Sequence, residues 1–235
     1  RKADSSTPFA LFLSWGPPHD PWTDDNTPEP FRLYFDERDF PNPPNYKPED
    51  DPYGDDWAKL SAEERKQLPK WRKNYYAQVA NLDWNLGRLL ETLKETGLEN
   101  DTLVVFTSDH GEMFGAQGRR AKNIFYEEAC RIPLLLRWPG HIPAGVVSDA
   151  CISTIDLQPT LCELLGLSPR PDAQGMNLAK LVLGQEGDEP EAALMMICGA
   201  TAAWRDGHEW RALRDKHFTY AVYKRDGKAD FPPPL

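Results

Sequence analysis

The sequence predicts an α/β fold in which a largely parallel central sheet is flanked by helices. Two short apolar runs, Thr102–Ser108 and Pro133–Trp138, are typical of buried strands because turn-forming residues bound them. A long stretch of helical periodicity precedes the first run, and another follows the second. Helices that alternate with apolar strands are characteristic of α/β domains, whose strands are buried on both faces.

The first predicted strand is the apolar run Phe9–Ser14, which ends at a loop containing Gly16 and several prolines. Residues 23–56 are rich in Pro, Asp and Asn and lack a sustained period. They predict a long irregular segment with one short element near Phe31–Phe35. Loops of this length are usually functional or disordered, and the aromatic content favours an ordered loop near a pocket entrance.

The long helix is predicted from about Lys70 to about Thr96. Ser61 and Glu64 have the spacing of a capping box just upstream, and Gly97 is suited to end the helix. The residues of its apolar stripe are Tyr75, Val79, Leu82, Leu86, Leu89, Leu90 and Leu93.

The last third predicts one more helix and three strands. The helix begins at Ser153 or Thr154 and runs through Leu165, where Gly166 closes it. The expected strands are Ala193–Ile197, Trp210–Arg214 and Phe218–Tyr223, of which the last two form a hairpin.

These elements predict two domains. Residues 1–190 are expected to belong to an α/β domain. Residues 191–235 are expected to be the truncated start of a smaller C-terminal α+β subdomain with an antiparallel sheet.

The composition is that of a folded protein. The 235 residues are 40% hydrophobic and 27% charged, which provides for a sizeable apolar core. The formal net charge of -10 argues against non-specific nucleic-acid binding, but a local cluster of cations can still hold a small anionic substrate. No apolar run reaches the length of a membrane span, and the four cysteines match no zinc pattern, so ordinary thiols are expected.

The segment that carries the chemistry is Thr107–Met113 (TSDHGEM), directly after a predicted buried strand. Asp109 supplies a hard carboxylate oxygen, and His110 supplies an imidazole nitrogen. Gly111 permits a sharp turn that lets these neighbours share one cation. The alternative is that Asp109 caps a helix and His110 lies on the surface. The position favours the metal site, because ligand sites of α/β folds form where loops leave the carboxyl ends of strands.

Two further side chains are candidates for binding an anion. Lys122 lies between Thr107–Met113, here called the metal segment, and the next predicted strand. Its ammonium could hold an anionic oxygen there, although a lone lysine is more often solvated. His19 lies between prolines and could donate to a substrate oxygen or protonate a leaving group. On residue type alone, a loop histidine bonded to the backbone is the more common role.

The other charged residues of this region are expected to be structural. Glu127 and Glu128 can begin a helix, pair with Arg131 or orient Lys122, and structural roles are favoured over catalysis. Arg119 and Arg120 add positive charge and are expected to face solvent.

These pieces, in this order, resemble the formylglycine-dependent sulfatases of the alkaline phosphatase superfamily. The matching stretches are Ser14–Trp22 (SWGPPHDPW), Tyr75–Leu90 (YYAQVANLDWNLGRLL), Thr102–Met113 (TLVVFTSDHGEM) and Lys122–Gly140 (KNIFYEEACRIPLLLRWPG). Weaker similarity continues into the last third, so the resemblance touches most of the chain. The joint occurrence of TSDHGE and of the lysine followed by YEE and RIPL is specific.

The resemblance implies an alkaline phosphatase-like fold, in which residues 1–190 would be the C-terminal portion of the α/β catalytic domain. It also implies a role for each candidate residue. Asp109 and His110 would be two ligands of a Ca²⁺ or Mg²⁺ ion. Lys122 would contact the sulfate, and His19 would contact the sulfate or act near the leaving oxygen. Gln117 stands where relatives often have histidine, which leaves some substrate contacts open.

The resemblance also implies groups that this chain does not contain. The nucleophile of such enzymes is a formylglycine made from Cys or Ser in a Cys/Ser-x-Pro/Ala-x-Arg motif, and none of the four cysteines fits it. The family's N-terminal pair of metal-binding aspartates is absent as well. We therefore expect the C-terminal part of a sulfuric ester hydrolase, inactive on its own, that acts on a sulfated small molecule or a sulfated carbohydrate.

Two alternatives remain open. A phosphonate monoester hydrolase or phosphodiesterase of the same superfamily shares the metal and formylglycine residues. A non-catalytic sulfatase-like binding protein is also consistent with the fold, although the joint retention of Asp109, His110 and Lys122 counts against it.

Overall fold

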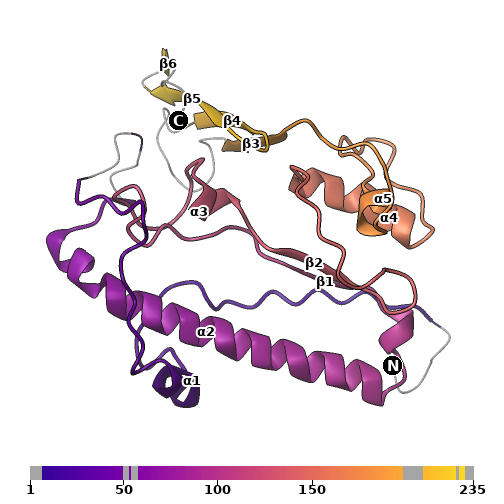
Figure 1. Cartoon of the computed structure of the whole chain (residues 1–235), viewed down its shortest axis with the longest axis horizontal. Coiled ribbons are helices and arrows are strands. Elements are labelled where there is room, and N and C mark those ends of the chain that lie inside the picture. Colours follow the sequence, from indigo (N-terminus) through magenta and orange to yellow (C-terminus); the bar gives the residue numbers. More distant parts are fainter. Residues whose placement is uncertain (1–6, 50–52, 54–57, 198–208, 226–227, 231–235) are drawn as a thin grey trace. The chain divides into compact units, whose positions relative to one another are not determined.

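A computed structural model of the chain describes residues 7–49, 53, 58–197, 209–225 and 228–230 (Figure 1). Contacts divide the chain into two compact units, residues 1–41 with 66–90 and residues 42–65 with 91–235. The predicted domain boundary near residue 190 stays a prediction.

The long helix α2 (Ala62–Glu95) is a single element of 34 residues (Figure 1). It begins at Ala62 rather than near Lys70 because the capping box at Ser61 is formed. The Ser61 amide donates to the Glu64 carboxylate at 2.8 Å, and the Glu64 amide donates to the Ser61 hydroxyl at 3.2 Å. Pro69 lies inside the helix but removes only one helical hydrogen-bond donor. Gly97 follows the helix with a positive φ of 70°, as expected.

The predicted apolar stripe of α2 is not buried. Val79 is 39% and Leu89 36% exposed, and the other residues of the stripe are half-buried. The buried residues of the helix instead include Arg72, Asn74 and Gln78. Their polar side chains bind the loops of the first unit, which also contains the short helix α1 (Glu29–Tyr34) within the predicted irregular segment.

The prediction of a strand at Phe9–Ser14 is wrong for this structure. The segment is extended, but it joins no sheet in the described part of the chain. Phe12 is 91% and Leu11 65% exposed, so both faces of the segment carry uncovered apolar side chains. A strand needs neighbouring strands to satisfy its backbone groups, and the described residues provide none here.

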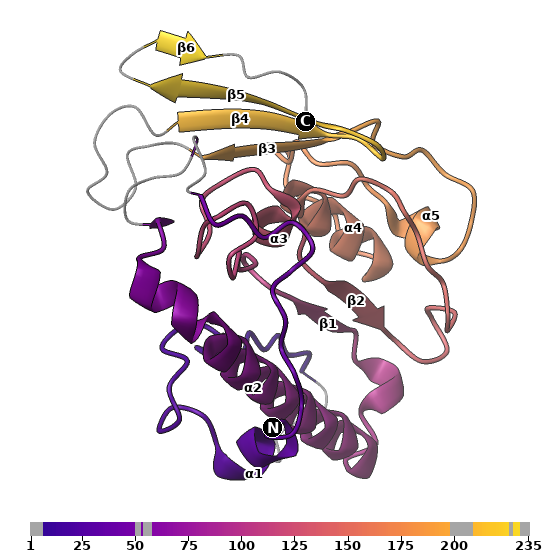
Figure 2. The ribbon, with the colours of Figure 1, turned by 60° about the vertical axis from the view of Figure 1, so that its left-hand side comes forward.

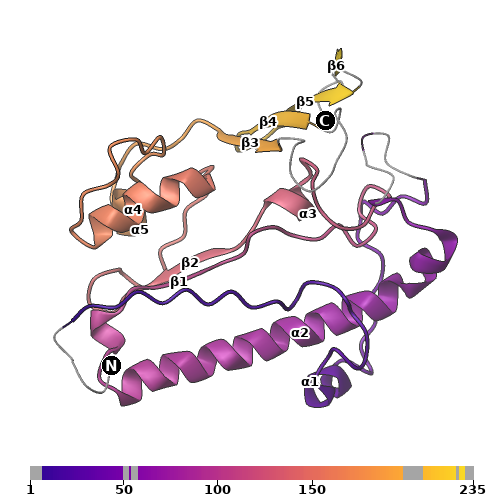
Figure 3. The same ribbon diagram turned by 180° about the vertical axis from the view of Figure 1, so that it is seen from behind.

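The two short apolar runs pair with each other. β1 (Val104–Thr107) and β2 (Leu134–Arg137) lie side by side (Figure 3). They form an antiparallel ribbon in which Thr107 lies opposite Leu134. The expectation of a largely parallel sheet is therefore not met among the described residues. Parallel strands need a long crossover, usually a helix. Between β1 and β2 the only helix is α3 (Glu127–Cys130), with four residues, and the chain returns antiparallel.

The strands predicted in the last third are confirmed. β3 (Ala193–Ile197), β4 (Glu209–Arg214), β5 (Thr219–Arg225) and β6 (Lys228–Asp230) form one antiparallel sheet in that order (Figure 2). Side chains from β4 and β5 pack against the segment that connects β1 to β2. The buried members of this core are Met113, Ala116, Ile124, Phe125, Ala129, Trp210, Ala212 and Ala221.

The predicted helix after Ser153 is also confirmed. It consists of the 3-10 turn η3 (Thr154–Asp156) and α4 (Leu157–Leu164), and Gly166 follows with a φ of 66°. The short helix α5 (Ala179–Val182) packs beside α4. In the ranges that the structure describes, no helix has the length and apolar character needed to cross a membrane.

Candidate active site

The turn after β1 brings the two candidate metal ligands together. Asp109 Oδ2 lies 3.6 Å from His110 Nε2. Two ligands bound at right angles to one Ca²⁺ at about 2.4 Å are separated by roughly 3.4 Å. The observed separation therefore suits two ligands of a single ion. The Asp109 side chain is 86% exposed, so its carboxylate is accessible to such an ion.

Local hydrogen bonds fix the orientation of His110. Its Nδ1 lies 2.8 Å from the Gly111 carbonyl oxygen, and because a carbonyl only accepts, Nδ1 carries the proton. The neutral ring then has its lone pair on Nε2, the atom beside Asp109. The Ser108 hydroxyl donates to the His110 carbonyl at 2.8 Å, and the His110 amide donates to Asp109 Oδ1 at 3.0 Å. The turn is thus arranged as a metal-binding histidine requires.

Gly111 allows the turn to lie directly against α3. Its amide donates to the Ala129 carbonyl at 2.9 Å. A Cβ atom at position 111 would collide with the Glu128 carbonyl oxygen. The requirement for glycine here is close backbone approach.

Glu112 connects the metal segment to the loop that carries Lys122. Its Oε1 accepts hydrogen bonds from the amides of Ala121 at 2.6 Å and Phe114 at 3.3 Å. Burial raises the pKa of the Glu112 carboxyl, whereas these two hydrogen bonds and the positive charge of Lys122 act to lower it. The residue was not assigned a role from the sequence, because nothing in the pattern shows which backbone amides a glutamate reaches.

The loop before Lys122 has an unusual backbone. Phe114, Gln117, Ala121 and Asn123 are the non-glycine residues with positive φ in the described part of the chain. Left-handed conformations are disfavoured for such residues and persist where surrounding contacts impose them, often at functional sites.

Arg119 corrects the expectation of a solvent-facing side chain. It is only 1% exposed, and its guanidinium donates to the Lys122 carbonyl at 3.4 Å. Arg120 is half-buried and lies 3.4 Å from the Glu64 carboxylate. The two arginine side chains therefore help to hold the loop before Lys122 in place.

The structural roles expected for Glu127 and Glu128 are confirmed. Both lie in the first turn of α3. Glu127 accepts from Arg214 Nε at 2.6 Å, and Glu128 accepts from Asn45 Nδ2 at 2.5 Å. The first contact joins α3 to β4, and the second joins it to the long irregular segment.

His19 belongs to the first unit, whereas Asp109, His110 and Lys122 belong to the second. The His19 ring contacts the Asp20 carboxylate and is 48% exposed. The loop after it is held by α2, because Asn74 Nδ2 donates to the Trp22 carbonyl at 2.9 Å and Trp22 Nε1 donates to the Pro18 carbonyl at 2.8 Å.

The described residues contain no group of three or more His, Cys, Asp or Glu side chains that could hold a metal ion. Asp109 and His110 are two donors, and Ca²⁺ or Mg²⁺ takes six or more ligands. The pair fits part of a coordination shell.

The described cysteines form no disulfide with one another. Cys130, Cys151 and Cys162 are free thiols, as expected, and Cys198 lies outside the described residues. Burial, with a contribution from the charge of Glu127, raises the pKa of Cys130 to about 11. Its thiol therefore stays protonated and unreactive near neutral pH.

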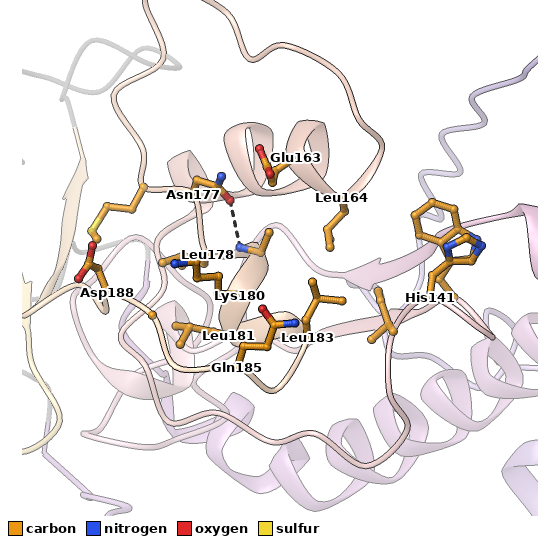
Figure 4. Close-up of a pocket in the computed structure, with 15 residues that line it drawn as sticks. His141, Glu163, Leu164, Asn177, Leu178, Lys180, Leu181, Leu183, Gln185 and Asp188 are labelled. Atoms are coloured by element: carbon orange, nitrogen blue, oxygen red, sulfur yellow. Dashed lines mark hydrogen bonds between the residues drawn. The ribbon is translucent and has the colours of Figure 1, made fainter.

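A cavity of about 710 Å³ lies beside α4 and α5, and Figure 4 shows the residues that line it. It is lined by the turn after β2, where His141 stacks on Trp138 with ring centroids 4.0 Å apart, and by residues of α4 and α5. Trp138 follows the end of β2 that pairs with Val104, which is the end opposite the Asp109 turn. The cavity contains none of the candidate site residues.

Comparison with known proteins identifies the family. The profile described as Sulfatase matches residues 1–167. The chain belongs to the sulfatase family. A second profile, described as the C-terminal part of N-sulphoglucosamine sulphohydrolase, matches residues 115–225 of this sulfatase chain.

Individual relatives agree with this membership. An ulvan-active sulfatase of Formosa agariphila is 30% identical, over 94% of this sulfatase chain and 41% of that protein. A crystal structure of a Bacteroides fragilis protein, provisionally described as a sulfatase, is 31% identical, with a TM-score of 0.79 over 97% of this chain and 47% of that one. The sulfatase chain therefore spans less than half the length of these relatives. Their likeness shows the alkaline phosphatase-like α/β fold.

Two further solved structures differ in the ligands or reactions their names state. One is in complex with its substrate D-glucosamine-2-N,6-O-disulfate; it is 28% identical, with a TM-score of 0.64 over 74% of the sulfatase chain and 36% of that chain. The other is a phosphonate monoester hydrolase of Agrobacterium radiobacter. It is 31% identical, with a TM-score of 0.63 over 77% of the sulfatase chain and 36% of that chain.

Proposed function

We propose that this chain forms the anion-receiving side of the active site of a sulfuric ester hydrolase. Family membership supports the reaction class. The observation that carries the proposal is the 3.6 Å separation of Asp109 Oδ2 and His110 Nε2 on the turn after β1. In this proposal Lys122 binds the sulfate, and His19 binds the sulfate or donates to the leaving oxygen.

Asp109 and His110 are assigned as two ligands of a Ca²⁺ or Mg²⁺ ion. The exposed carboxylate and the oriented imidazole support this assignment. Such an ion, when bound, stabilises the negative charge that develops on the sulfate oxygens in the transition state. The Lys122 ammonium supplies hydrogen-bond donors to the same sulfate oxygens.

The nucleophile is assigned to a formylglycine outside this chain, in the part of the enzyme that the chain does not span. That part is also proposed to complete the largely parallel central sheet. The uncovered apolar side chains of Phe9–Ser14 and the half-buried strands β1 and β2 support this view, because strands of parallel sheets are normally covered on both faces.

The substrate class proposed is a sulfated carbohydrate, with a sulfated small molecule as the alternative. The solved relative that holds a disulfated glucosamine supports the carbohydrate. The relative that is a phosphonate monoester hydrolase supports a second candidate function, hydrolysis of a phosphonate monoester on the same metal and lysine residues.

The test uses the complete protein with a chromogenic aryl sulfate and a matched phosphonate monoester. We expect higher kcat/KM for the sulfate, loss of activity in EDTA, and recovery with Ca²⁺ or Mg²⁺. The variant Asp109→Ala should lower kcat/KM by at least about a hundredfold, because the charge stabilisation is lost.

The matched control is His141→Ala, which removes an exposed ring stacked on Trp138, remote from the Asp109 turn along the β1–β2 ribbon. Its kcat/KM should equal that of the wild type. Preference for the phosphonate would replace the first candidate with the second, and full activity of Asp109→Ala would remove both.

A further inference from the structure

Glu112 is a single side chain that touches both segments of the proposed site. It lies two residues after His110, and its Oε1 accepts a 2.6 Å hydrogen bond from the amide of Ala121, the residue before Lys122. The same oxygen accepts from the Phe114 amide at 3.3 Å. One carboxylate oxygen therefore joins the metal segment to Ala121, the residue directly before Lys122.

Ala121 needs such support. Its φ is 64°, a left-handed conformation that alanine disfavours. The Glu112 carboxylate accepts a hydrogen bond from the Ala121 amide, and the Ala121 carbonyl accepts one from the Met113 amide at 3.0 Å. Both backbone polar groups of Ala121 are thus held by consecutive residues of the metal segment, which imposes the conformation.

The other side of Lys122 is held by the sheet. The indole Nε1 of Trp210 on β4 donates to the Asn123 carbonyl at 3.1 Å. With Ala121 fixed by Glu112 and Asn123 fixed by Trp210, the backbone of Lys122 has a defined position relative to His110.

We propose that Glu112 is a positioning residue that sets Lys122 relative to the Asp109–His110 pair. The inference rests on the proposed function, since it gives Lys122 an anion to bind. Glu112 acts through the Ala121 amide and does not itself touch the substrate. The same placement would be lost if the carboxylate were removed, but kept by any side chain with an acceptor oxygen at that point.

A matched carboxylate exists elsewhere in the same unit. Asp156 also accepts two backbone amides, Met176 at 2.8 Å on Oδ1 and Ser153 at 2.8 Å on Oδ2. It is 5% exposed and joins the start of α4 to the chain before α5. Asp156→Ala therefore removes a comparable pair of hydrogen bonds without touching the segments that carry Lys122 and His110.

The experiment compares variants of the complete protein. Glu112→Ala should lower kcat/KM for the aryl sulfate by about 10- to 100-fold, as is usual for residues that orient those binding the substrate or metal. Glu112→Gln keeps an acceptor oxygen and should stay within about threefold of the wild type. Asp156→Ala should reduce thermal stability but leave kcat/KM unchanged.

A double-mutant cycle with Lys122→Ala identifies the route. If Glu112 acts through Lys122, the double variant should be no slower than Lys122→Ala alone, within about threefold. Additive losses would mean that Glu112 acts otherwise, and the inference would be wrong.

A binding measurement separates this inference from the proposed function. Inorganic sulfate should raise the Tm of the wild type, Glu112→Gln and Asp156→Ala, and raise it less in both Glu112→Ala and Lys122→Ala. An unchanged sulfate response in Glu112→Ala, or none in the wild type, overturns the inference. A normal pattern of sulfate responses in a protein that hydrolyses neither ester would overturn only the proposed function.

Discussion

Gly111 is the residue on which the geometry of the Asp109 turn depends. A side chain at this position would meet the Glu128 carbonyl oxygen, whereas Gly87, on the exposed side of α2, has nothing within 4 Å of an added Cβ. We expect Gly111→Ala to lower the free energy of unfolding by about 3 kcal/mol, because packed backbone must move. Gly87→Ala should raise it by about 0.5 to 1 kcal/mol, because alanine is the better helix former.

Urea denaturation of both variants measures this contrast. A decrease for Gly87→Ala as large as that for Gly111→Ala would show that close approach to Glu128 is not the reason for glycine in the turn. Gly111→Ala should also lose activity with the aryl sulfate, since the turn that joins Asp109 and His110 would shift.

At this scale the sequence identified residues whose chemistry is local. Asp109 and His110 are neighbours, so their shared position after a strand could be predicted from the chain itself. Arg119 and Glu112 could not be assigned, because their partners are backbone groups chosen by the path of the 114–123 loop. That path uses left-handed residues such as Phe114 and Gln117, for which the residue type gives no signal.

The element that organises the first unit is α2, whose polar side chains hold the loop after His19. Asn74 Nδ2 binds both the Trp22 carbonyl at 2.9 Å and the Asp24 carboxylate at 3.0 Å. The Asn74 hydrogen bond to Asp24 has the largest effect on this carboxyl, and the contact with Lys70 at 2.9 Å comes next. Together they hold the pKa of Asp24 below its ordinary value of about 3.9. The loop is therefore anchored by a network that depends on Asn74.

We predict that Asn74→Ala raises the pKa of Asp24 toward its ordinary value. Because the folded pKa is lowered, ionised Asp24 contributes stability above about pH 3.9 and loses it as the pH falls through the folded pKa. The free energy of unfolding of Asn74→Ala should therefore fall less steeply than that of the wild type as the pH is lowered. NMR titration of the Asp24 carboxyl measures the shift. Asn85→Ala removes a side chain whose hydrogen bonds run to Asn81 and Arg88 within α2, and it should leave the Asp24 pKa unchanged.

Elements were predicted well where local signals define them. The cap at Ser61, the glycine after α2 and the alternating strands of the β4–β5 hairpin are properties of a few adjacent residues. Which face of α2 is buried was not predictable, because the apolar stripe with Val79 and Leu89 is uncovered in this chain. A parallel arrangement is not seen for β1 and β2, because the segment after β1 forms a core with Trp210 instead of a crossover helix.

At the scale of the whole molecule, apolar surface is distributed as in part of a larger domain. Phe12 is 91% exposed and lies in an apolar run, while β1 and β2 are half-buried rather than buried. The chain spans 41% of one relative and 47% of another. The proposed function assigns the covering partners of the predicted strands to the part of the enzyme that this chain does not span.

This reasoning gives a test of the proposed parallel sheet. In the isolated 235-residue chain, Phe12→Ser should change the Tm very little, because surface substitutions alter stability by less than about 0.5 kcal/mol. In the complete protein the same substitution should cost about 3 kcal/mol, because Phe12 would then be a buried residue of a central strand. Val147 is 93% exposed but lies outside any predicted strand, so Val147→Ser should be neutral in both proteins. Thermal unfolding followed by circular dichroism measures all four variants. Equal, small effects of Phe12→Ser in both proteins would mean that residues 9–14 stay uncovered in the complete enzyme, and that the central sheet does not include them.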